Sequence, residues 1–402
     1  MNRYAKQIEN FPPRAYNVST FSRSEETNML IINAVIPMND TFLSDMRVRL
    51  EKGCIAAIGA DLSPLPGEET LDLGGDHLLP GFVDVHIHAF KGCDAMQGEE
   101  AVRAMSRGLY EAGVAAFLPT TMSAFPPETL AAVQGVRAVM NAPEQRGAKV
   151  LGAHMEAPFL NPKKCGAQLP ECLCDPDWAA FLDMVGGDVS AVKMMTLAPE
   201  LPGADDFIRQ AKAEGIVISL GHSAATAEQA HHAADLGASH VTHTFNAQPP
   251  LHHREPGLTG AALTDDRLYA EFISDGIHLH GDIVRLLCAA KGAKKAVAIT
   301  DAMEAAGMPD GEYSLGGQPV TVKDGQARLH DGTLAGSVLT MKQALSNLIH
   351  RFGIAPIHAV RMCTATPAES IEEAVCGRMC VGSPVPLTRW TKDWQFISIL
   401  EA

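Results

Sequence analysis

The sequence predicts an α/β protein: a (β/α)8 TIM-like barrel with a small β-sandwich domain formed from both chain ends. Three observations lead to this expectation: a length of 402 residues, an apolar strand-like run that recurs eight times after residue 80, and segments of helical period between these runs. A chain of this length has room for one large barrel and a smaller companion domain. Near-continuous apolar runs are expected where both faces of a parallel sheet are buried.

The small β domain is expected from short strand-like segments near the two ends of the chain. They are separated by Asn, Asp and Gly breaks and cover residues 29–36, 45–50, 54–58, 69–73, 77–79 and 390–400. The predicted domain comprises residues 29–80 and 376–402. Residues 1–28 are left as an N-terminal extension.

The barrel is predicted over residues 81–375. Its expected strands are 82–88, 115–120, 150–156, 191–197, 216–222, 240–245, 269–274 and 296–301. Helices are expected near 98–112, 127–141, 176–185, 203–214, 224–236, 280–292, 340–351 and 356–363, and a β insertion at about 312–336. The fifth helix has clear end signals, since Thr226 and Gln229 can form a capping box and Gly237 suits the position after the last turn.

Composition narrows the class of protein. The chain is 46% hydrophobic and 20% charged, with a formal net charge of -15, and it has no Lys/Arg-rich block, so we expect no nucleic-acid partner. No apolar run approaches the roughly 20 residues of a membrane helix. Met1 to Thr27 lack the apolar run of a signal peptide. Nine cysteines without a disulfide-scaffold spacing predict reduced thiols and a cytoplasmic location.

Metal-ligand residues occur where the predicted strands end. In a barrel of this kind the C-terminal ends of the strands form the active face. The spacing of Asp84, His86 and His88 predicts that all three point to one face of the first strand. The other strand ends carry Glu156, His222, His243, Asp275 with His278 in the following loop, and Asp301. Imidazoles and carboxylates that converge are ligands for a divalent ion, which predicts a metal-dependent hydrolase.

Together with these residues, an ordered set of stretches resembles the amidohydrolase superfamily and, within it, the N-acetylglucosamine-6-phosphate deacetylases. The stretches are 79–88, 152–159, 197–200, 242–247, 253–257, 274–278, 300–302 and 332–337. No single stretch is decisive, but their order over roughly residues 29–370 is specific. The resemblance implies the hydrolysis of an acetamide with the help of metal-activated water.

The resemblance also implies roles for the ligand residues. Glu156, His222 and His243 would hold the ion that activates water, and Asp301 would act as general acid and base beside it. His278 would contact the substrate acetamide and stabilise the oxyanion. His86 and His88 favour a second ion, with Glu156 as the bridge. One or two ions per subunit are therefore expected, Zn²⁺ or Fe²⁺ first, with Mn²⁺, Co²⁺ or Ni²⁺ as alternatives.

Substrate recognition follows from the same resemblance. Arg254 would reach the phosphate of the substrate in the neighbouring subunit, which implies a homodimer. Asn246 and Ala247 resemble the backbone donors for that phosphate, and Ala167 and Gln168 resemble the loop over the sugar. The expected partner is a small amino-sugar phosphate.

Three alternatives to N-acetylglucosamine 6-phosphate hydrolysis stay open: a deacetylase of another N-acetyl amino-sugar phosphate such as N-acetylgalactosamine 6-phosphate, an N-acyl amino acid hydrolase, and a non-catalytic sugar-phosphate-binding homologue. Arg254 favours a phosphorylated substrate over an N-acyl amino acid. Asp301 argues against a silent binder, which has no need of a proton shuttle.

Overall fold

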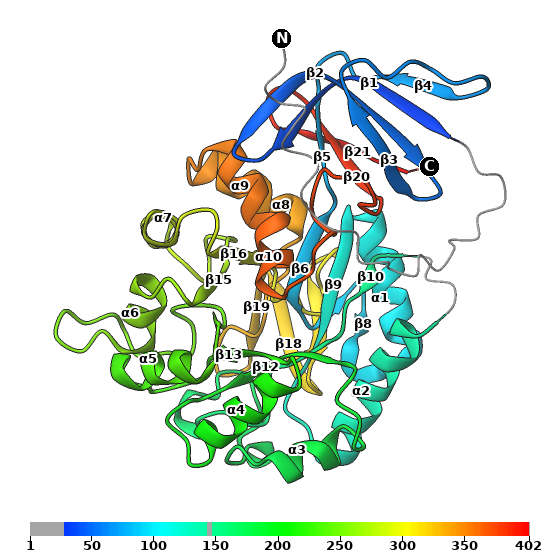
Figure 1. The fold of residues 1–402 in the computed structure, drawn as a ribbon. Helices are drawn as coiled ribbons and strands as arrows, with labels where there is room; N and C mark the ends of the chain where they lie inside the picture. Colours follow the sequence, from blue (N-terminus) through cyan, green and yellow to red (C-terminus); the bar gives the residue numbers. More distant parts are fainter. Residues whose placement is uncertain (1–27, 143–146, 402) are drawn as a thin grey trace.

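The small domain joins the two ends of the chain in the computed structural model, which describes residues 28–142 and 147–401. Two sheets, drawn at the top of Figure 1, share β1. Both contribute to one apolar core in which Ile31, Leu50 and Leu387 are buried. The strands are β1 (Met29–Met38), β2 (Thr41–Glu51), β3 (Cys54–Gly59), β4 (Glu69–Asp72), β5 (His77–Leu79), β20 (Leu387–Trp390) and β21 (Phe396–Leu400). Most of the predicted extension, residues 1–27, lies outside the described residues.

Below this domain, parallel strands form a nearly closed barrel. They are β6 (Phe82–Ile87), β9 (Val114–Thr121), β10 (Lys149–Val150), β11 (Ala153–Met155), β12 (Val192–Leu197), β13 (Val217–Leu220), β14 (His240–Val241), β15 (Tyr269–Ile273) and β16 (Ala296–Ile299), with β10 and β11 as two pieces of one barrel strand. The last and first strands meet where the backbone N–H of Asp301 donates to the His86 carbonyl at 2.9 Å. The predicted fold class is confirmed.

Helices cover the outside of the barrel (Figure 1). They are α1 (Glu99–Glu111), α2 (Pro126–Met140), α3 (Trp178–Met184), α4 (Ala204–Ala213), α5 (Ala227–Leu236), α6 (Gly257–Thr264), α7 (Gly281–Lys291), α8 (Met341–Ser346), a π-helical turn at Asn347–Arg351, α9 (Pro356–Cys363) and α10 (Ala365–Ser370). Short 3-10 turns lie at Ala95–Gln97, Pro162–Lys164 and Pro170–Cys172, and β7 (Ala89–Phe90) pairs with β8 (Cys93–Asp94). None of the described helices is both long and apolar enough to cross a membrane.

The start of α5 follows its predicted chemistry. The Thr226 side chain accepts from the backbone of Gln229, and the Gln229 side chain accepts from the backbone of Thr226. Gly237 follows the last turn with φ 126°. The predicted capping box is therefore confirmed.

Two helices were not expected from the sequence. In α6 nearly every residue is buried, so its sequence lacks the alternation of polar and apolar faces that indicates a surface helix. Helix α10 is short and also largely buried. Both helices depend on tertiary packing more than on a local signal.

The predicted strand over residues 240–245 was too long. Strand β14 ends at Val241, and a turn follows in which His243, Phe245 and Ala247 have φ of 26°, 81° and 52°. The alternating Thr, His and Phe side chains imitate a strand pattern. The backbone instead leaves the sheet, which brings His243 and Asn246 to the mouth of the barrel.

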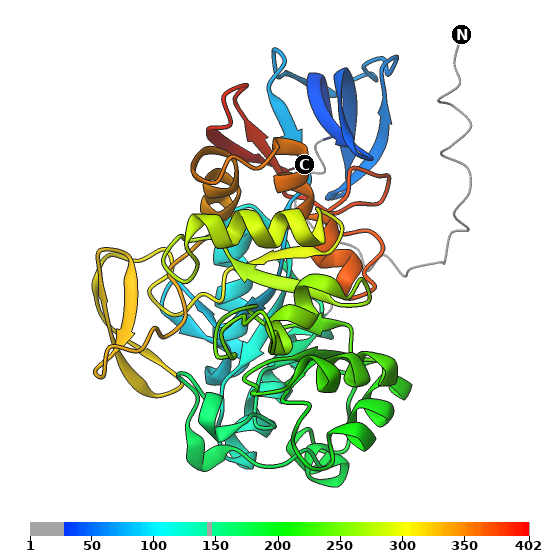
Figure 2. The same ribbon diagram turned by 90° about the vertical axis from the view of Figure 1, so that its left-hand side faces the viewer.

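After β16, a three-stranded antiparallel sheet stands out from the barrel (Figure 2). Its strands are β17 (Gly311–Leu315), β18 (Gln318–Lys323) and β19 (Gln326–Leu329). Leu315 and Val320 of this sheet pack with Met122 and Met303 of the barrel loops. We call residues 311–336 the flap, because several of them line the cavity described next.

Candidate metal centre and active site

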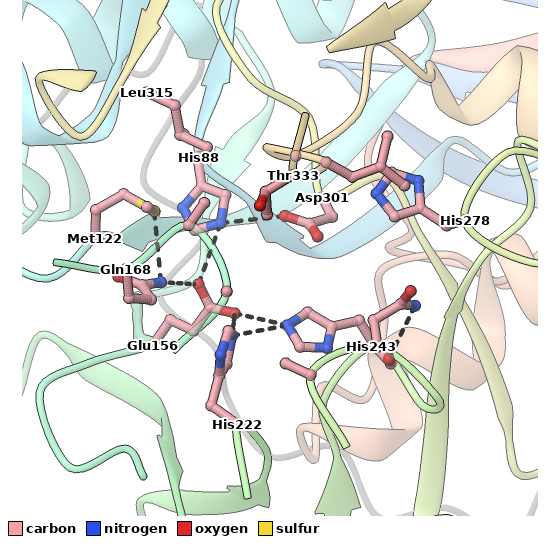
Figure 3. Close-up of a pocket in the computed structure, with 16 residues that line it drawn as sticks. His88, Met122, Glu156, Gln168, His222, His243, His278, Asp301, Leu315 and Thr333 are labelled. Carbon is pink, nitrogen blue, oxygen red and sulfur yellow. Dashed lines mark hydrogen bonds and ion pairs between the residues drawn. The ribbon is translucent and has the colours of Figure 1, made fainter. Parts of the chain in front are cut away.

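A cavity of about 240 Å³ opens at the C-terminal ends of the barrel strands (Figure 3). Its lining residues come from the barrel loops and from the flap: His88, Met122, Glu156, Gly166, Ala167, Gln168, His222, His243, Asn246, Ala247, His278, Asp301, Leu315, Thr333, Leu334 and Gly336. Many of the residues singled out in the sequence therefore meet in one place, although they are far apart along the chain.

One ligand group consists of Glu156, His222 and His243, whose ligand atoms all lie within 4.8 Å of one another. Glu156 Oε1 is 3.2 Å from His222 Nε2 and 3.0 Å from His243 Nε2. The two Nε2 atoms are 3.0 Å apart. All three residues are buried, and they follow β11, β13 and β14.

A second group consists of His86, His88 and Asp301. Asp301 Oδ1 is 3.1 Å from His88 Nε2 and 3.6 Å from His86 Nε2. Glu156 lies between the two groups, since its Oε2 is 3.3 Å from His88 Nε2 while its Oε1 faces the first group. A carboxylate in this position can bridge two ions.

The hydrogen bonds of the imidazoles fit metal ligation. His222 Nδ1 is 2.8 Å from the Lys164 carbonyl, and His88 Nδ1 is 3.2 Å from the Thr120 carbonyl. A carbonyl can only accept, so each Nδ1 carries a proton, and each Nε2 is the nitrogen that faces the carboxylates and that would offer its lone pair to a bound ion. Lone pairs and carboxylates that converge are the donor set a divalent ion requires.

Both carboxylates are held in the ionised form. Burial opposes ionisation of Glu156, but His86 and the hydrogen bonds from His222 and His243 hold the pKa of its carboxyl well below its usual range. Burial also opposes ionisation of Asp301, yet His86 and His88 lower its pKa to about 2. Both groups can therefore serve as anionic ligands at neutral pH.

Asp84 does not join the histidines, and this part of the prediction was wrong. Its Oδ2 accepts from Thr300 Oγ1 at 2.6 Å, and its Oδ1 accepts from the Thr300 N–H at 3.3 Å. The pairing of β6 with β9 has an irregularity between Asp84 and Ile87, which breaks the strict alternation of faces. Asp84 therefore ties β6 to the end of β16, and His86 and His88 point to the cluster.

His278 lies beside Asp301 at the cavity (Figure 3). Its Nδ1 is 2.7 Å from Asp275 Oδ2, and Asp275 Oδ1 accepts from the backbone N–H groups of Ile277 and His278 at 2.8 and 2.9 Å. Asp275 thus fixes both the loop and the ring. This leaves His278 Nε2 for a contact with substrate.

Of the predicted substrate residues, Ala167, Gln168, Asn246 and Ala247 line the cavity. The Gln168 amide is already engaged: its Nε2 donates to Glu156 Oε2 at 2.6 Å, and its Oε1 accepts from the Ser123 N–H at 2.6 Å. Arg254 is exposed and is not among the lining residues of its own chain.

Sequence reasoning missed the part that Glu271 and the flap play in the site. Glu271 lies inside β15, fully buried, with Oε2 3.1 Å from His86 Nδ1; a charged residue within an apolar strand run was the available signal. Leu315 and Thr333 of the flap line the cavity. In the sequence, the stretch 332–337 is part of the family resemblance, but its residues do not indicate that it folds back over the barrel.

A barrel with two such ligand groups on its C-terminal rim defines a class, the barrel hydrolases that use divalent metal. A family model described as "Amidohydrolase family" matches residues 77–398. The chain therefore belongs to the amidohydrolase family.

The chain is also similar to individual members of this family over most of its length. The chain is 36% identical over 334 residues to an N-acetylgalactosamine-6-phosphate deacetylase of Escherichia coli, covering 82% of this chain and 86% of the relative. It is 38% identical over 325 residues to an N-acetylglucosamine-6-phosphate deacetylase of Bacillus subtilis, covering 80% and 82%. The predicted resemblance to these deacetylases is confirmed.

Solved structures agree with the sequence relatives. The N-acetylglucosamine-6-phosphate deacetylase of Pasteurella multocida superposes with a TM-score of 0.85 at 29% identity, over 93% of this chain and 98% of that chain. The corresponding enzyme of Thermotoga maritima gives a TM-score of 0.83 at 31% identity, over 93% and 98%.

Proposed function

We propose that this protein hydrolyses the acetamide of N-acetylglucosamine 6-phosphate to glucosamine 6-phosphate and acetate. The observation that carries the proposal is the position of Asp301, which belongs to the second ligand group and lines the same cavity as Glu156, His222 and His243. The relatives that share the fold and most of the chain length are deacetylases of amino-sugar phosphates. We propose a cytoplasmic location, in keeping with cysteines that are all free thiols.

The chain's own groups fit the steps of this reaction. Glu156, His222 and His243 would hold a divalent ion, with His86 and His88 available for another. When bound, the ion would polarise the acetamide and make water ionise near neutral pH. Asp301 would take a proton from the attacking water and deliver it to the amine as the C–N bond breaks and the new C–O bond forms. His278, held by Asp275, would contact the acetamide oxygen.

Phosphate recognition would involve a second copy of the chain. Arg254 is exposed, with Nη1 2.7 Å from His253 Nε2, and it lies outside the cavity of its own chain. We propose that it reaches the phosphate bound in the neighbouring subunit of a homodimer, while Asn246 and Ala247 approach the same phosphate. Ala167 and Gln168 would lie over the sugar.

The galacto epimer is the second candidate substrate. One relative of this chain, at 36% identity, is an N-acetylgalactosamine-6-phosphate deacetylase. The two epimers differ only in the configuration of one hydroxyl group. The same metal-ligand groups would therefore suit the acetamide of either sugar.

The decisive experiment measures acetate release from N-acetylglucosamine 6-phosphate, its galacto epimer and unphosphorylated N-acetylglucosamine. We expect the phosphorylated gluco substrate to have the highest kcat/KM, and Asp301→Asn to lower kcat by about 10²–10⁴-fold. Asp183→Asn, an exposed carboxylate on α3, is the matched control and should leave turnover unchanged. An Asp301→Asn protein with near-normal turnover contradicts the acid–base assignment.

The same assay tests Arg254. In Arg254→Ala, KM for the phosphorylated sugar should rise while turnover of unphosphorylated sugar stays unchanged. Equal kcat/KM of the unaltered protein with and without phosphate, or a monomer at the assay concentration, contradicts the proposed role of Arg254.

A further inference from the structure

Glu271 is a buried carboxylate that the proposed reaction does not use. It lies in the middle of β15 and is fully buried, while its neighbours Ala270 and Phe272 pack in the apolar cluster between the barrel and its helices. Glu271 therefore points to the barrel interior, below the ligand groups.

The carboxylate is only half satisfied. Oε2 lies 3.1 Å from His86 Nδ1 and 3.4 Å from the backbone N–H of His243. Oε1 is buried and has no hydrogen-bond partner among the described residues, and no lysine or arginine of the described chain pairs with Glu271. A buried carboxyl group with one oxygen unpaired costs free energy to bury.

His86 is the group through which Glu271 can act. A carboxylate that accepts from Nδ1–H fixes the tautomer of the ring and raises the basicity of Nε2. His86 Nε2 is 3.4 Å from Glu156 Oε1 and 3.6 Å from Asp301 Oδ1, and it is buried with no hydrogen-bond partner among the described residues. Among the imidazoles of the two ligand groups, His88 and His222 also have a bonded Nδ1, and their partners are neutral carbonyls.

We propose that Glu271 is a positioning residue, which accepts from Nδ1–H of His86 and holds the ring so that Nε2 faces the ligand group of His86, His88 and Asp301. This inference rests on the proposed function in assigning metal to the cluster. Three carboxyl groups surround the His86 ring: those of Glu156 and Asp301 face Nε2, and that of Glu271 faces Nδ1.

The test is a metal titration rather than an activity assay. Apoprotein is prepared with a chelator and titrated with Zn²⁺, and bound metal is then counted by elemental analysis. The unaltered protein should bind two ions per chain in two steps. In Glu271→Gln and Glu271→Leu, the weaker step should lose affinity by about 10–100-fold while the tighter step is unchanged. Glu271→Asp should recover part of the loss.

Ser274→Ala is the matched control, because Ser274 directly follows the same strand, is buried, and its hydroxyl has no partner among the described residues. It should keep both steps. Should Glu271→Leu fail to fold, Glu271→Gln decides, since it has nearly the same shape; circular dichroism of the apoprotein checks its fold.

Three outcomes overturn the inference: one ion per chain in the unaltered protein, two undisturbed steps in Glu271→Gln, or an equal loss of affinity in both steps. The last would mean that Glu271 only supports the barrel through the backbone of His243. An unaltered protein that releases no acetate would refute the proposed substrate, but it would leave a Glu271-dependent second ion standing.

Discussion

Glu156 occupies the centre of the site, and Gln168 is the neighbour outside the two ligand groups that helps to orient it. Gln168 donates to Glu156 Oε2, and the Gln168 side chain is itself fixed because its Oε1 accepts from the Ser123 N–H. Glu156 can therefore present Oε1 to His222 and His243 with little freedom to rotate. A buried amide with these two hydrogen bonds would hold the Glu156 carboxylate in place for a metal ion, in addition to any contact with the sugar.

We expect Gln168→Leu to speed metal loss to a chelator by about tenfold or more, because groups that orient a metal ligand typically contribute 10–100-fold to affinity. Gln210→Leu on the exposed side of α4 is the control and should not change the rate. Metal retention at the normal rate with a higher KM would assign Gln168 to the sugar alone.

At the level of secondary structure elements, strand ends and their turns determine where the ligands point. His222, His243 and Asp301 follow β13, β14 and β16, with φ of 46°, 26° and 50°. Left-handed backbone is uncommon for such residues and is typical of functional sites that the surrounding structure holds in place. These turns carry the side chains from the strand ends over the mouth of the barrel.

The flap is the other element that shapes the site. Leu315 lines the cavity, and Gln318 Nε2 donates to the Ala167 carbonyl at 2.6 Å. This bond joins the flap to the loop after β11, which the resemblance places over the sugar. The flap thus forms part of the cavity wall and is tied to the loop that lines it.

We expect Gln318→Ala to raise KM several-fold and to leave the melting temperature unchanged, because the lost bond orders the sugar loop more than it stabilises the fold. Thr321→Ala, on the same strand with its hydroxyl 3.0 Å from Glu312 Oε2 within the flap, should change neither quantity. A Gln318→Ala protein with normal KM would show that the loop is ordered without the flap.

Over the whole molecule, the small domain is anchored to the barrel through its C-terminal strands. Trp390 is 1% exposed, belongs to the same apolar cluster as Val114 and Leu109 of the barrel, and its ring centroid is 6.3 Å from that of Phe82. Phe82 begins β6, the strand that carries His86. The domain at the chain ends therefore supports the strand on which the second ligand group depends.

Trp390→Ala should lower the free energy of unfolding by about 3–5 kcal/mol, the usual cost of truncating a large buried aromatic side chain. Trp178→Ala on α3, where the side chain is only half-buried, should cost less. Calorimetry of both variants checks this. The anchoring role of Trp390 is wrong if the two losses are equal.

The sequence by itself determined the barrel and the chemical types of its ligands. Apolar runs that alternate with segments of helical period indicate strands whose two faces are both buried. Helix caps such as that of Thr226 are readable in the sequence because they depend only on nearby backbone groups. Glu156, His222, His243 and Asp301 were found because a parallel barrel brings the carboxyl ends of its strands together.

Only the tertiary structure decided which faces and which neighbours these residues have. The irregularity beside β6 separated Asp84 from His86 and His88, and a turn replaced the end of the predicted strand at His243. Glu271 meets His86 only because the barrel closes, which brings side chains of β15 and β6 together across its interior although the two strands are not paired. A local pattern records period and propensity, whereas bulges, turns and pairing between distant strands decide where each side chain points.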